Sequence, residues 1–409
     1  MKYNKNYTFN NLTATEEDNL TLLNDYALSL KEDPEKYLNE LAILSTFTSI
    51  LQKDITVLIK KTKEISYKNV ILVGIGGSSM GVKAVWDFLG KNSTKKLTVL
   101  DTVNTDLLTS LKDSKEFTPE NAVVIFVSKS GTTLESIVNL EILNQYGYLT
   151  QDRFFAVVSE NSDIKDSLTE VSKNIYYISE YLSGRYSIFS WVGILPLTLL
   201  GIDTKDFLQS AEETLKSFYR DIKSSEAIET SVMLHRFFLE QRYIYNNFSL
   251  DPTLNSLMFW YRQLYSESVG KDANRYQSYF MPNIATADYH SVLQMYFASP
   301  KNQIFSFLST PINTEPIKIT DPRFYSNLDT QTTSFIYETL NISVAKTADE
   351  LSIPCIDISI NKTERDLAHF LVTKILEVMF LCRLLGVNAF NQPNIESYKK
   401  NAKNIIESN

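Results

Sequence analysis

Ser128 to Thr133 form a short polar stretch that carries four side-chain hydroxyls and one ammonium group. It follows the apolar, β-branched run Ala122–Val127, which predicts a buried strand, and it precedes Leu134–Leu140, whose apolar spacing predicts a helix. Backbone N–H groups and the positive dipole end at a helix start attract anions. The stretch therefore predicts a site for a phosphate monoester. An ordinary Ser/Thr helix cap is the alternative, but a cap needs fewer donors.

A second loop, Gly74–Ser79, also lies between a predicted strand and a predicted helix. Its glycines suggest the dinucleotide motif Gly-x-Gly-x-x-Gly, and Asp101 after the next strand could bind a ribose. The motif fails because Ser79 occupies the position of the third glycine. Two hydroxyl-bearing loops on strand ends of one sheet favour a small polyol phosphate over an extended dinucleotide.

Glu267 is a candidate general base further along the chain. It lies at the end of an amphipathic helix that is predicted to start at Asp251-Pro252, just before the glycine turn at Gly270. A carboxylate at the negative end of a helix binds a proton more readily than one in water, which suits a base. A surface glutamate near a helix end is the alternative, and position alone favours it.

Three other polar residues have two interpretations each when the residues are considered alone. His290 is one of only three histidines, and an isolated histidine is more often structural than catalytic. Arg185 precedes a strongly apolar helix, where it either binds an anion or caps a turn. Lys399 lies in the last predicted helix, which opens at Gln392-Pro393. Lysines near a chain end are usually solvated.

Composition excludes several classes of protein. The chain has 409 residues, which predicts two or three domains, and its net charge of −8 argues against partners such as nucleic acid or a membrane surface. Two cysteines in apolar surroundings predict buried free thiols in a reducing cytoplasm. Three histidines and no Cys/His cluster predict no metal site. The N-terminus has no signal-peptide pattern, so we expect a soluble, cytoplasmic protein.

The longest apolar run, Ile188–Leu200, is shorter than the roughly 20 residues that span a bilayer, and Pro196 interrupts it. A buried helix is the better interpretation. Long helices are predicted to continue from Ser187 to Asn246 and to leave the first domain. Two or three helices are predicted within residues 15–64.

Alternating strands and helices begin at Asn69 and predict a parallel sheet covered on both faces, in which ligands bind beyond the C-terminal strand ends. The predicted strands of this first region are Val70–Val73, Leu97–Leu100, Ala122–Val127, Phe154–Val158 and Ile175–Ile178. Its predicted helices are Met80–Leu89, Asp106–Lys112 and Thr133–Gln145. A second α/β region is predicted from strands Ile304–Leu308 and Pro354–Ile358 and a helix at Thr363–Leu385.

Five of these segments together resemble glucose-6-phosphate isomerases (phosphoglucose isomerases) of the compact bacterial type. The resemblance runs from Asn69 to Lys399, and the five motifs occur in the order of that family. One such motif is weak evidence, whereas five in order are hard to obtain by chance. The motifs are Gly74–Ser78, Ser128–Thr133, Gly184–Ser187, Gln263–Lys271 and Asn391–Lys399.

The resemblance implies an α/β fold of two sugar-isomerase (SIS) domains, each a mainly parallel sheet between helical layers in a three-layer αβα arrangement. The expected divisions are a helical segment 1–65, a first SIS domain 66–185, a helical connection with the second SIS domain 186–390, and a C-terminal helix 391–409. It also implies a homodimer with shared active sites. One subunit lends His290 to the other's site, and the C-terminal helix crosses over to place Lys399.

The implied reaction is the aldose–ketose isomerisation of glucose 6-phosphate to fructose 6-phosphate, by an intramolecular oxidoreductase without cofactor or metal. The resemblance makes Glu267 the base that moves a proton between C2 and C1 through a cis-enediol. Arg185 stabilises the developing charge, and His290, with Lys399 nearby, opens the sugar ring. The implied substrate-binding residues are Gly77, Ser78, Ser128, Lys129, Ser130, Thr133 and Gln392.

The chain departs from the family pattern at four loop positions. Ser183 stands where a glycine is usual, and Ala389, Asn391 and Asn394 replace the usual Pro, Asp and Gly. All the residues with an assigned chemical role are retained, so these departures concern loop conformation.

Two other functions remain open. One is a bifunctional phosphoglucose/phosphomannose isomerase of the same superfamily. The other is a non-catalytic SIS sensor that binds a sugar phosphate and reports it to a partner. Such sensors usually carry a DNA-binding domain, whereas the N-terminal segment here is acidic at Glu16, Glu17 and Asp18.

Overall fold

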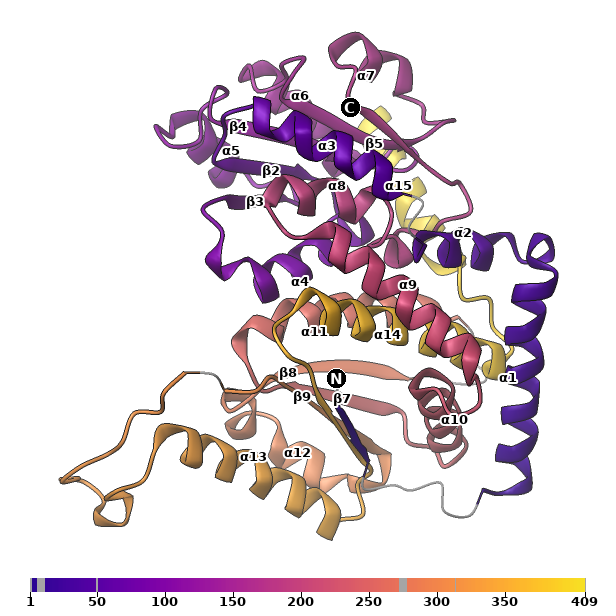
Figure 1. Ribbon diagram of the computed structural model, residues 1–409, viewed down its shortest axis with the longest axis vertical. Helices are drawn as coiled ribbons and strands as arrows, with labels where there is room; N and C mark the ends of the chain where they lie inside the picture. Colours follow the sequence, from indigo (N-terminus) through magenta and orange to yellow (C-terminus); the bar gives the residue numbers. More distant parts are fainter. Residues whose placement is uncertain (1, 6–11, 49–50, 272–277, 313, 409) are drawn as a thin grey trace.

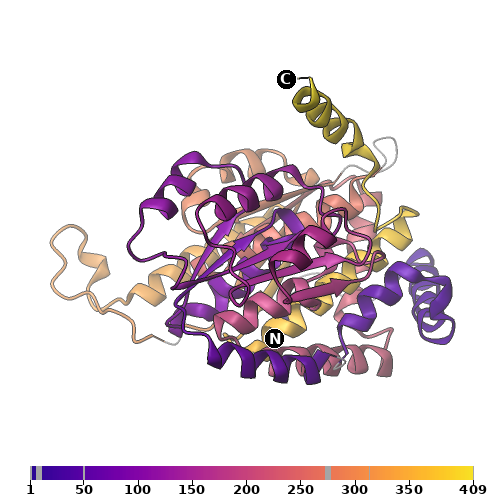
Figure 2. The ribbon, with the colours of Figure 1, turned by 90° about the horizontal axis from the view of Figure 1, so that it is seen from above.

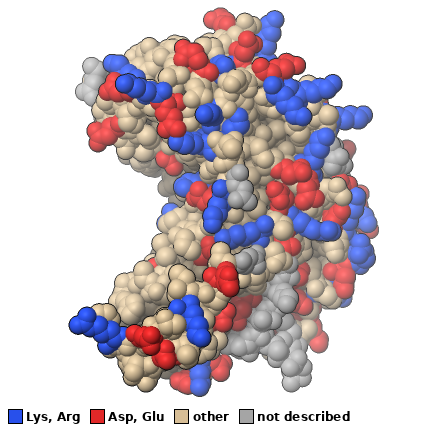
Figure 3. All heavy atoms as spheres, turned by 60° about the vertical axis from the view of Figure 1, so that its left-hand side comes forward, with Lys and Arg blue, Asp and Glu red and all other residues tan. Residues whose placement is uncertain are grey.

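The computed structural model describes residues 2–5, 12–48, 51–271, 278–312 and 314–408. Two five-stranded sheets lie one above the other, with helices between and around them (Figure 1). The surface is hollowed between the two lobes, and acidic and basic side chains are interspersed over the face that Figure 3 shows.

The first sheet has the strand order β3-β2-β4-β5-β6, and all its neighbouring strands are parallel. Strands β2, β4 and β5 are buried along their whole length, because helices cover both faces of the sheet. All five strands predicted from the sequence are confirmed to within one residue at either end. They are β2 (Asn69–Val73), β3 (Lys96–Leu100), β4 (Ala122–Val127), β5 (Phe154–Ser159) and β6 (Ile175–Ile178).

The second sheet has the order β1-β10-β9-β7-β8, in which β1 is antiparallel to β10 and the other pairs are parallel. The N-terminal strand β1 was not predicted, and it joins a sheet whose other strands begin more than 200 residues later. The strands are β1 (Lys2–Lys5), β7 (Ile244–Ser249), β8 (Tyr279–Ile284), β9 (Gln303–Ser309) and β10 (Cys355–Ser359).

The prediction of continuous helices up to Asn246 is wrong at its end, because β7 begins at Ile244. The sequence does not reveal this strand, because two asparagines interrupt the apolar pattern of its buried interior. The Asn246 amide donates to Gln303 Oε1 at 2.7 Å, and the Asn247 amide donates to the Tyr245 carbonyl at 3.1 Å. These hydrogen bonds make buried polar side chains compatible with a strand that has no apolar run.

Helices pack on both sheets and fill the space between them. The predicted buried helix is confirmed as α8, which is buried along its whole length with Pro196 inside it. Among described residues, no helix is long and apolar enough to cross a membrane. The α-helices of the N-terminal half are α1 (Ala14–Glu32), α2 (Leu38–Thr46), α3 (Gln52–Glu64), α4 (Met80–Leu89), α5 (Thr105–Asp113), α6 (Leu134–Gln145), α7 (Lys165–Val171) and α8 (Trp191–Leu200).

The α-helices of the C-terminal half include two that project from the body of the molecule. Helix α13 extends from the lower lobe in Figure 1, and α15 extends outward in Figure 2. These helices are α9 (Thr204–Arg220), α10 (Glu226–Leu239), α11 (Asn255–Val269), α12 (Leu293–Ala298), α13 (Thr333–Glu350), α14 (Glu364–Leu385) and α15 (Glu396–Glu407).

Helix α11 joins the two lobes. It packs against α4 of the first lobe on one side and against α14 and β8 of the second lobe on the other. One continuous apolar cluster runs from Val70 of the first sheet through Leu257 and Leu264 of α11 to Ile304 of the second sheet. The end of α11 is therefore fixed relative to both sheets.

Apart from the edge strand β1, the two sheets share one strand order, in which the first strand (β2 or β7) lies between the second (β3 or β8) and the third (β4 or β9). Ligands in such sheets bind where the order reverses, which is between β2 and β4 in the first sheet and between β7 and β9 in the second. The Asp251 carboxylate lies at the second of these points. It accepts from the Thr253 amide at 2.8 Å, from Thr310 Oγ1 at 2.9 Å and from Lys362 Nζ at 3.0 Å.

The Asp251 cluster predicts a pH-dependent contribution to stability. Burial raises the pKa of Asp251, but hydrogen bonds from Thr253, Lys362 and Thr310 outweigh it and hold the pKa below its ordinary value. The contribution is therefore present above about pH 4 and is lost as the pH falls through the lower folded-state pKa. We expect Asp251→Asn to lower the melting temperature at pH 7 and to differ less from the wild type below about pH 4.

Thermal melts followed by circular dichroism at both pH values measure this difference. Asp152→Asn, at an exposed turn residue, serves as the control and should melt like the wild type at either pH. An Asp251→Asn protein with an unchanged melting temperature at pH 7 would contradict a stabilising cluster.

Candidate active site

The polar loop between β4 and α6 leaves the start of α6 without a side-chain cap. The buried Ser128 hydroxyl accepts from the Gly131 amide at 3.2 Å. Gly131 has a φ of +74°, and a Cβ there would lie 2.4 Å from Ser162 Oγ, so only glycine fits. Thr133 precedes the first residue of α6, and its side chain makes no capping hydrogen bond. The first amides of α6 thus remain available to a ligand.

Lys129 adds a half-buried cation beside this loop. Its Nζ donates to the carbonyls of Glu180 at 2.9 Å and Leu182 at 3.3 Å. Burial lowers the pKa of Lys129; the nearby Glu180 opposes this in part, and Arg185 adds a smaller lowering effect. A bound anion would stabilise the charged form of Lys129, because its negative charge offsets the loss of hydration that burial causes.

The loop after β2 packs directly on the turn that carries Arg185. A Cβ on Gly77 would lie 2.2 Å from the Gly184 carbonyl carbon and 2.6 Å from the Arg185 amide nitrogen. Glycine at position 77 is therefore what lets the two backbones touch. Ser78 follows in the same 3₁₀ turn, Gly76–Ser78. The predicted sugar-contacting residues thus lie against the predicted charge-stabilising residue.

Arg185 lies at the centre of the hydrogen-bond network and is only 2% exposed. Its Nε donates to Ser268 Oγ at 2.8 Å, and its Nη1 donates to Glu267 Oε2 at 3.1 Å. Its Nη2 donates to the carbonyls of Ala389 and Asn391. The guanidinium therefore joins the end of α11 to the segment that follows α14.

Three donors orient the Glu267 carboxylate. Gln263 Nε2 donates to Oε1 at 2.8 Å, while Arg185 Nη1 and Gln392 Nε2 both donate to Oε2. The Glu267 side chain remains 30% exposed, so these contacts leave part of it open to a ligand. A carboxylate that is fixed in this way and is still accessible can accept a proton from a bound molecule.

The predicted site residues of the first lobe and of α11 lie in one continuous set of contacts. A Cβ on Gly76 would lie 2.9 Å from Gln263 Nε2, and one on Gly74 would lie 3.1 Å from the Val127 carbonyl oxygen. The first distance joins the loop after β2 to the helix of Glu267. The second joins it to the polar loop after β4.

His290 and Lys399 lie elsewhere in the described part of the chain. His290 ends the 3₁₀ turn Ala287–His290 after β8 and lines a cavity of about 180 Å³ beside α13. Lys399 lies on the projecting helix α15, where its Nζ is 3.2 Å from Glu396 Oε1. A single chain does not bring either side chain to Glu267.

A family model described as phosphoglucose isomerase matches residues 46–334, which is more than half of the chain. The chain belongs to the phosphoglucose isomerase family. The resemblance inferred from the five motifs is confirmed.

Relatives of this family match over most of their length. The glucose-6-phosphate isomerase of Campylobacter jejuni is 29% identical over 356 residues, covering 83% of this chain and 86% of that protein. The glucose-6-phosphate isomerase of Mycoplasmopsis synoviae is 30% identical over 351 residues, covering 81% of each.

Solved structures confirm the α/β fold with two sheets flanked by helices. A hypothetical protein from Thermus thermophilus superposes with a TM-score of 0.84 at 20% identity and covers 96% of both chains. A glucose-6-phosphate isomerase from Chlamydia trachomatis gives a TM-score of 0.69 at 17% identity and covers 90% of this chain and 73% of that one. At these identities the likeness concerns the fold alone.

Three supporting residues of the candidate active site were not assigned roles from the sequence. Gln263, Ser268 and Lys271 all lie in the motif that surrounds Glu267. Gln263 could have been found, because a residue four positions earlier lies one helical turn away on the same face. Ser268 and Lys271 bind partners that are far away in the sequence, so no local pattern marks them.

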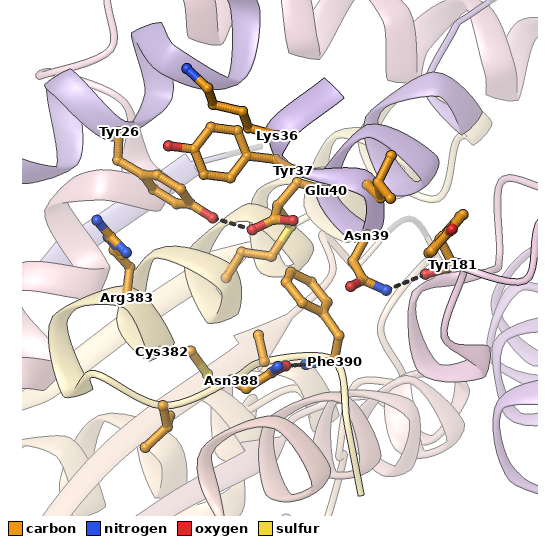
Figure 4. Close-up of a pocket in the computed structure, with 14 residues that line it drawn as sticks. Tyr26, Lys36, Tyr37, Asn39, Glu40, Tyr181, Cys382, Arg383, Asn388 and Phe390 are labelled. Atoms are coloured by element: carbon orange, nitrogen blue, oxygen red, sulfur yellow. Dashed lines mark hydrogen bonds between the residues drawn. The ribbon is translucent and has the colours of Figure 1, made fainter. Parts of the chain in front are cut away.

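A separate cavity of about 410 Å³ lies behind the segment that carries the Ala389 carbonyl. Figure 4 shows its walls, where the Tyr26 hydroxyl donates to Glu40 and the Asn39 amide donates to the Tyr181 carbonyl. Glu267 and the loops Gly74–Ser79 and Ser128–Thr133 are all absent from the residues that line this cavity. It is therefore distinct from the candidate active site.

The close backbone contact at Gly77 gives a test of this geometry. We expect Gly77→Ala to lower the free energy of unfolding by roughly 1–3 kcal/mol, because the new Cβ overlaps the Gly184 backbone. Denaturant titration measures the change. Gly184→Ala is the matched control across the same contact, since its Cβ would lie an ordinary 3.5 Å from Gly77 Cα. Equal destabilisation of the two variants would contradict the model of this contact.

Proposed function

We propose that this chain is a glucose-6-phosphate isomerase (EC 5.3.1.9), which interconverts glucose 6-phosphate and fructose 6-phosphate. Membership of the phosphoglucose isomerase family supports the activity, as do the names of the relatives. The observation that carries the proposal is the Glu267 carboxylate, held by three donors and still accessible. As an enzyme of glycolysis and gluconeogenesis, it acts in the cytoplasm.

The polar loop after β4 holds the phosphate group of the substrate. The first amides of α6 and the Lys129 ammonium supply positive charge, and the loop hydroxyls supply further hydrogen bonds. The phosphate ligands are Ser128, Lys129, Ser130 and Thr133. Gly77 and Ser78 line the sugar, because their loop lies between the phosphate loop and the Arg185 turn.

Glu267 takes the proton from C2 of the open-chain sugar and returns it to C1, while the hydroxyl proton at O2 passes to O1, so that the carbonyl moves from C1 to C2. One carboxylate within reach of both carbons can serve both transfers through a cis-enediol. Arg185 stabilises the negative charge that develops on the enediolate oxygen, and its guanidinium does not lose its proton in this step. Gln392, which donates to Glu267, also orients the sugar hydroxyls.

Ring opening requires His290 from a second copy of the chain. In its own chain it lines a cavity beside α13 that does not include Glu267, and both α13 and α15 expose apolar side chains. Phe324 is 95% exposed on the segment before α13, and Ile342 on α13 and Tyr398 on α15 are also largely exposed. Exposed apolar side chains on two projecting arms fit burial in a homodimer, in which Lys399 is placed at the same site. The division into segments 1–65, 66–185, 186–390 and 391–409 is part of this proposal.

Replacement of the base is the direct test of the reaction. We expect Glu267→Gln to reduce kcat by at least roughly 10²–10⁴-fold, while the binding of a sugar-phosphate inhibitor persists. A coupled assay with fructose 6-phosphate measures turnover, and calorimetry measures binding. Glu64→Gln, at the exposed end of α3, is the control and should have wild-type turnover.

Near-normal turnover of Glu267→Gln would refute its role as the base. Conversion of mannose 6-phosphate by the wild type would point to the bifunctional isomerase. Binding of hexose phosphates without conversion of any of them would instead favour the sensor.

Mixing two inactive variants tests the shared site. Co-expression of His290→Ala with Glu267→Gln should restore about a quarter of wild-type activity, because half of randomly assorted dimers are hybrids and each hybrid has one intact site. Each variant expressed alone is the control. No recovery in hybrids verified by affinity tags would contradict a site built from two chains.

A further inference from the structure

The segment 389–394 connects α14 to α15 and carries Gln392 into the active site. The end of α11 and the Arg185 turn hold it at several points. Arg185 donates to two of its carbonyls, and Gln392 donates to Glu267. Asn394 Nδ2 is 3.5 Å from the Gly270 carbonyl and 3.3 Å from the Lys271 carbonyl. The position of this segment therefore determines how Gln392 contacts the base.

Lys271 is the first residue after the glycine that caps α11, and it reaches this segment. Its half-buried Nζ donates to the carbonyl of Glu267 and to the carbonyl of Asn391. A lysine that simply satisfies a helix end would bind the last carbonyls of its own helix. This one also binds a carbonyl 120 residues away, directly before Gln392.

The Asn391 carbonyl accepts from two cations, Lys271 and Arg185. Because Gln392 is the next residue, fixing this carbonyl fixes the backbone from which the Gln392 side chain extends. If the carbonyl moved, Gln392 would lose its alignment with Glu267 Oε2. An error of about 1 Å in the placement of a catalytic group can cost roughly 100-fold in rate.

We propose that Lys271 is a positioning residue for the isomerase reaction, which acts by holding the Asn391 carbonyl so that Gln392 stays on the Glu267 carboxylate. Lys271 is not proposed to touch the substrate. The inference rests on the proposed function, since its effect is on the turnover of that reaction. It adds a role that lies outside the residues assigned to binding and proton transfer.

The environment of Lys271 makes its charge responsive to pH. Burial and the nearby Arg185 lower the pKa of Lys271 to about 8, while the Cys382 thiol and Glu267 act in the opposite direction. Raising the pH through this value removes the proton and weakens both hydrogen bonds, because charge-assisted bonds are the stronger ones. Turnover should then fall at alkaline pH without a corresponding loss of substrate affinity.

The test compares Lys271→Met and Lys271→Arg with the wild type over pH 6 to about 10, with circular dichroism to confirm folding. We expect Lys271→Met to reduce kcat by roughly 10–100-fold, to change KM less than about threefold and to lack the alkaline fall. Lys271→Arg should retain more activity and extend the plateau to higher pH. Lys91→Met is the matched control, because exposed Lys91 follows a helix-capping glycine in the same way and should leave kcat unchanged.

A double-mutant cycle with Gln392→Ala shows whether Lys271 acts through Gln392. If it does, Lys271→Met costs little more in kcat once Gln392 is gone. Additive losses, a rise in KM without a change in kcat, or a wild-type pH profile in Lys271→Met would each overturn the proposal. An inactive wild type would instead refute the proposed function, so the two failures are distinguishable.

Discussion

The hydrogen bonds of the buried Arg185 guanidinium are the interactions on which the site depends. A cation that is almost fully removed from water is tolerated only if its donors find acceptors, and here these come from separate parts of the chain. Ser268 and Glu267 belong to α11, and the carbonyls of Ala389 and Asn391 belong to the segment after α14. Satisfying one charge therefore brings together a turn, a helix end and a connecting segment.

The position of α11 between the lobes explains how this network can be rigid. The helix shares one apolar core with both sheets, so its last turn cannot move with one lobe alone. Glycine at position 77 then lets the first lobe approach the Arg185 turn with backbone against backbone. Packing thus sets the distance between the lobes, and hydrogen bonds select the orientation of the side chains within that distance.

The first sheet could be predicted from the sequence because its strands are continuous apolar runs such as Ala122–Val127. Two strands of the second sheet, β9 and β10, were also predicted to within one residue at either end. Strand β7 was missed because it buries Asn246 and Asn247 inside the sheet, and β1 was missed because it pairs with a strand about 350 residues away. Glu267 was correctly placed near the end of a helix, but its partners Gln392 and Arg185 depend on tertiary contacts. Only the family resemblance linked them before the fold was known.

The ion pair of Asp251 makes the C-terminal end of the second sheet different from that of the first. Apart from the edge strand β1, the sheets have the same strand order, and the first keeps an uncapped helix start where the second carries a carboxylate already paired with Lys362. The second lobe thus contains its own substitute for a bound anion. The equivalent ends of the two sheets therefore differ in charge: the first presents uncapped helix amides, and the second already contains an ion pair. The C-terminal half supplies α11 and the projecting helices α13 and α15 instead.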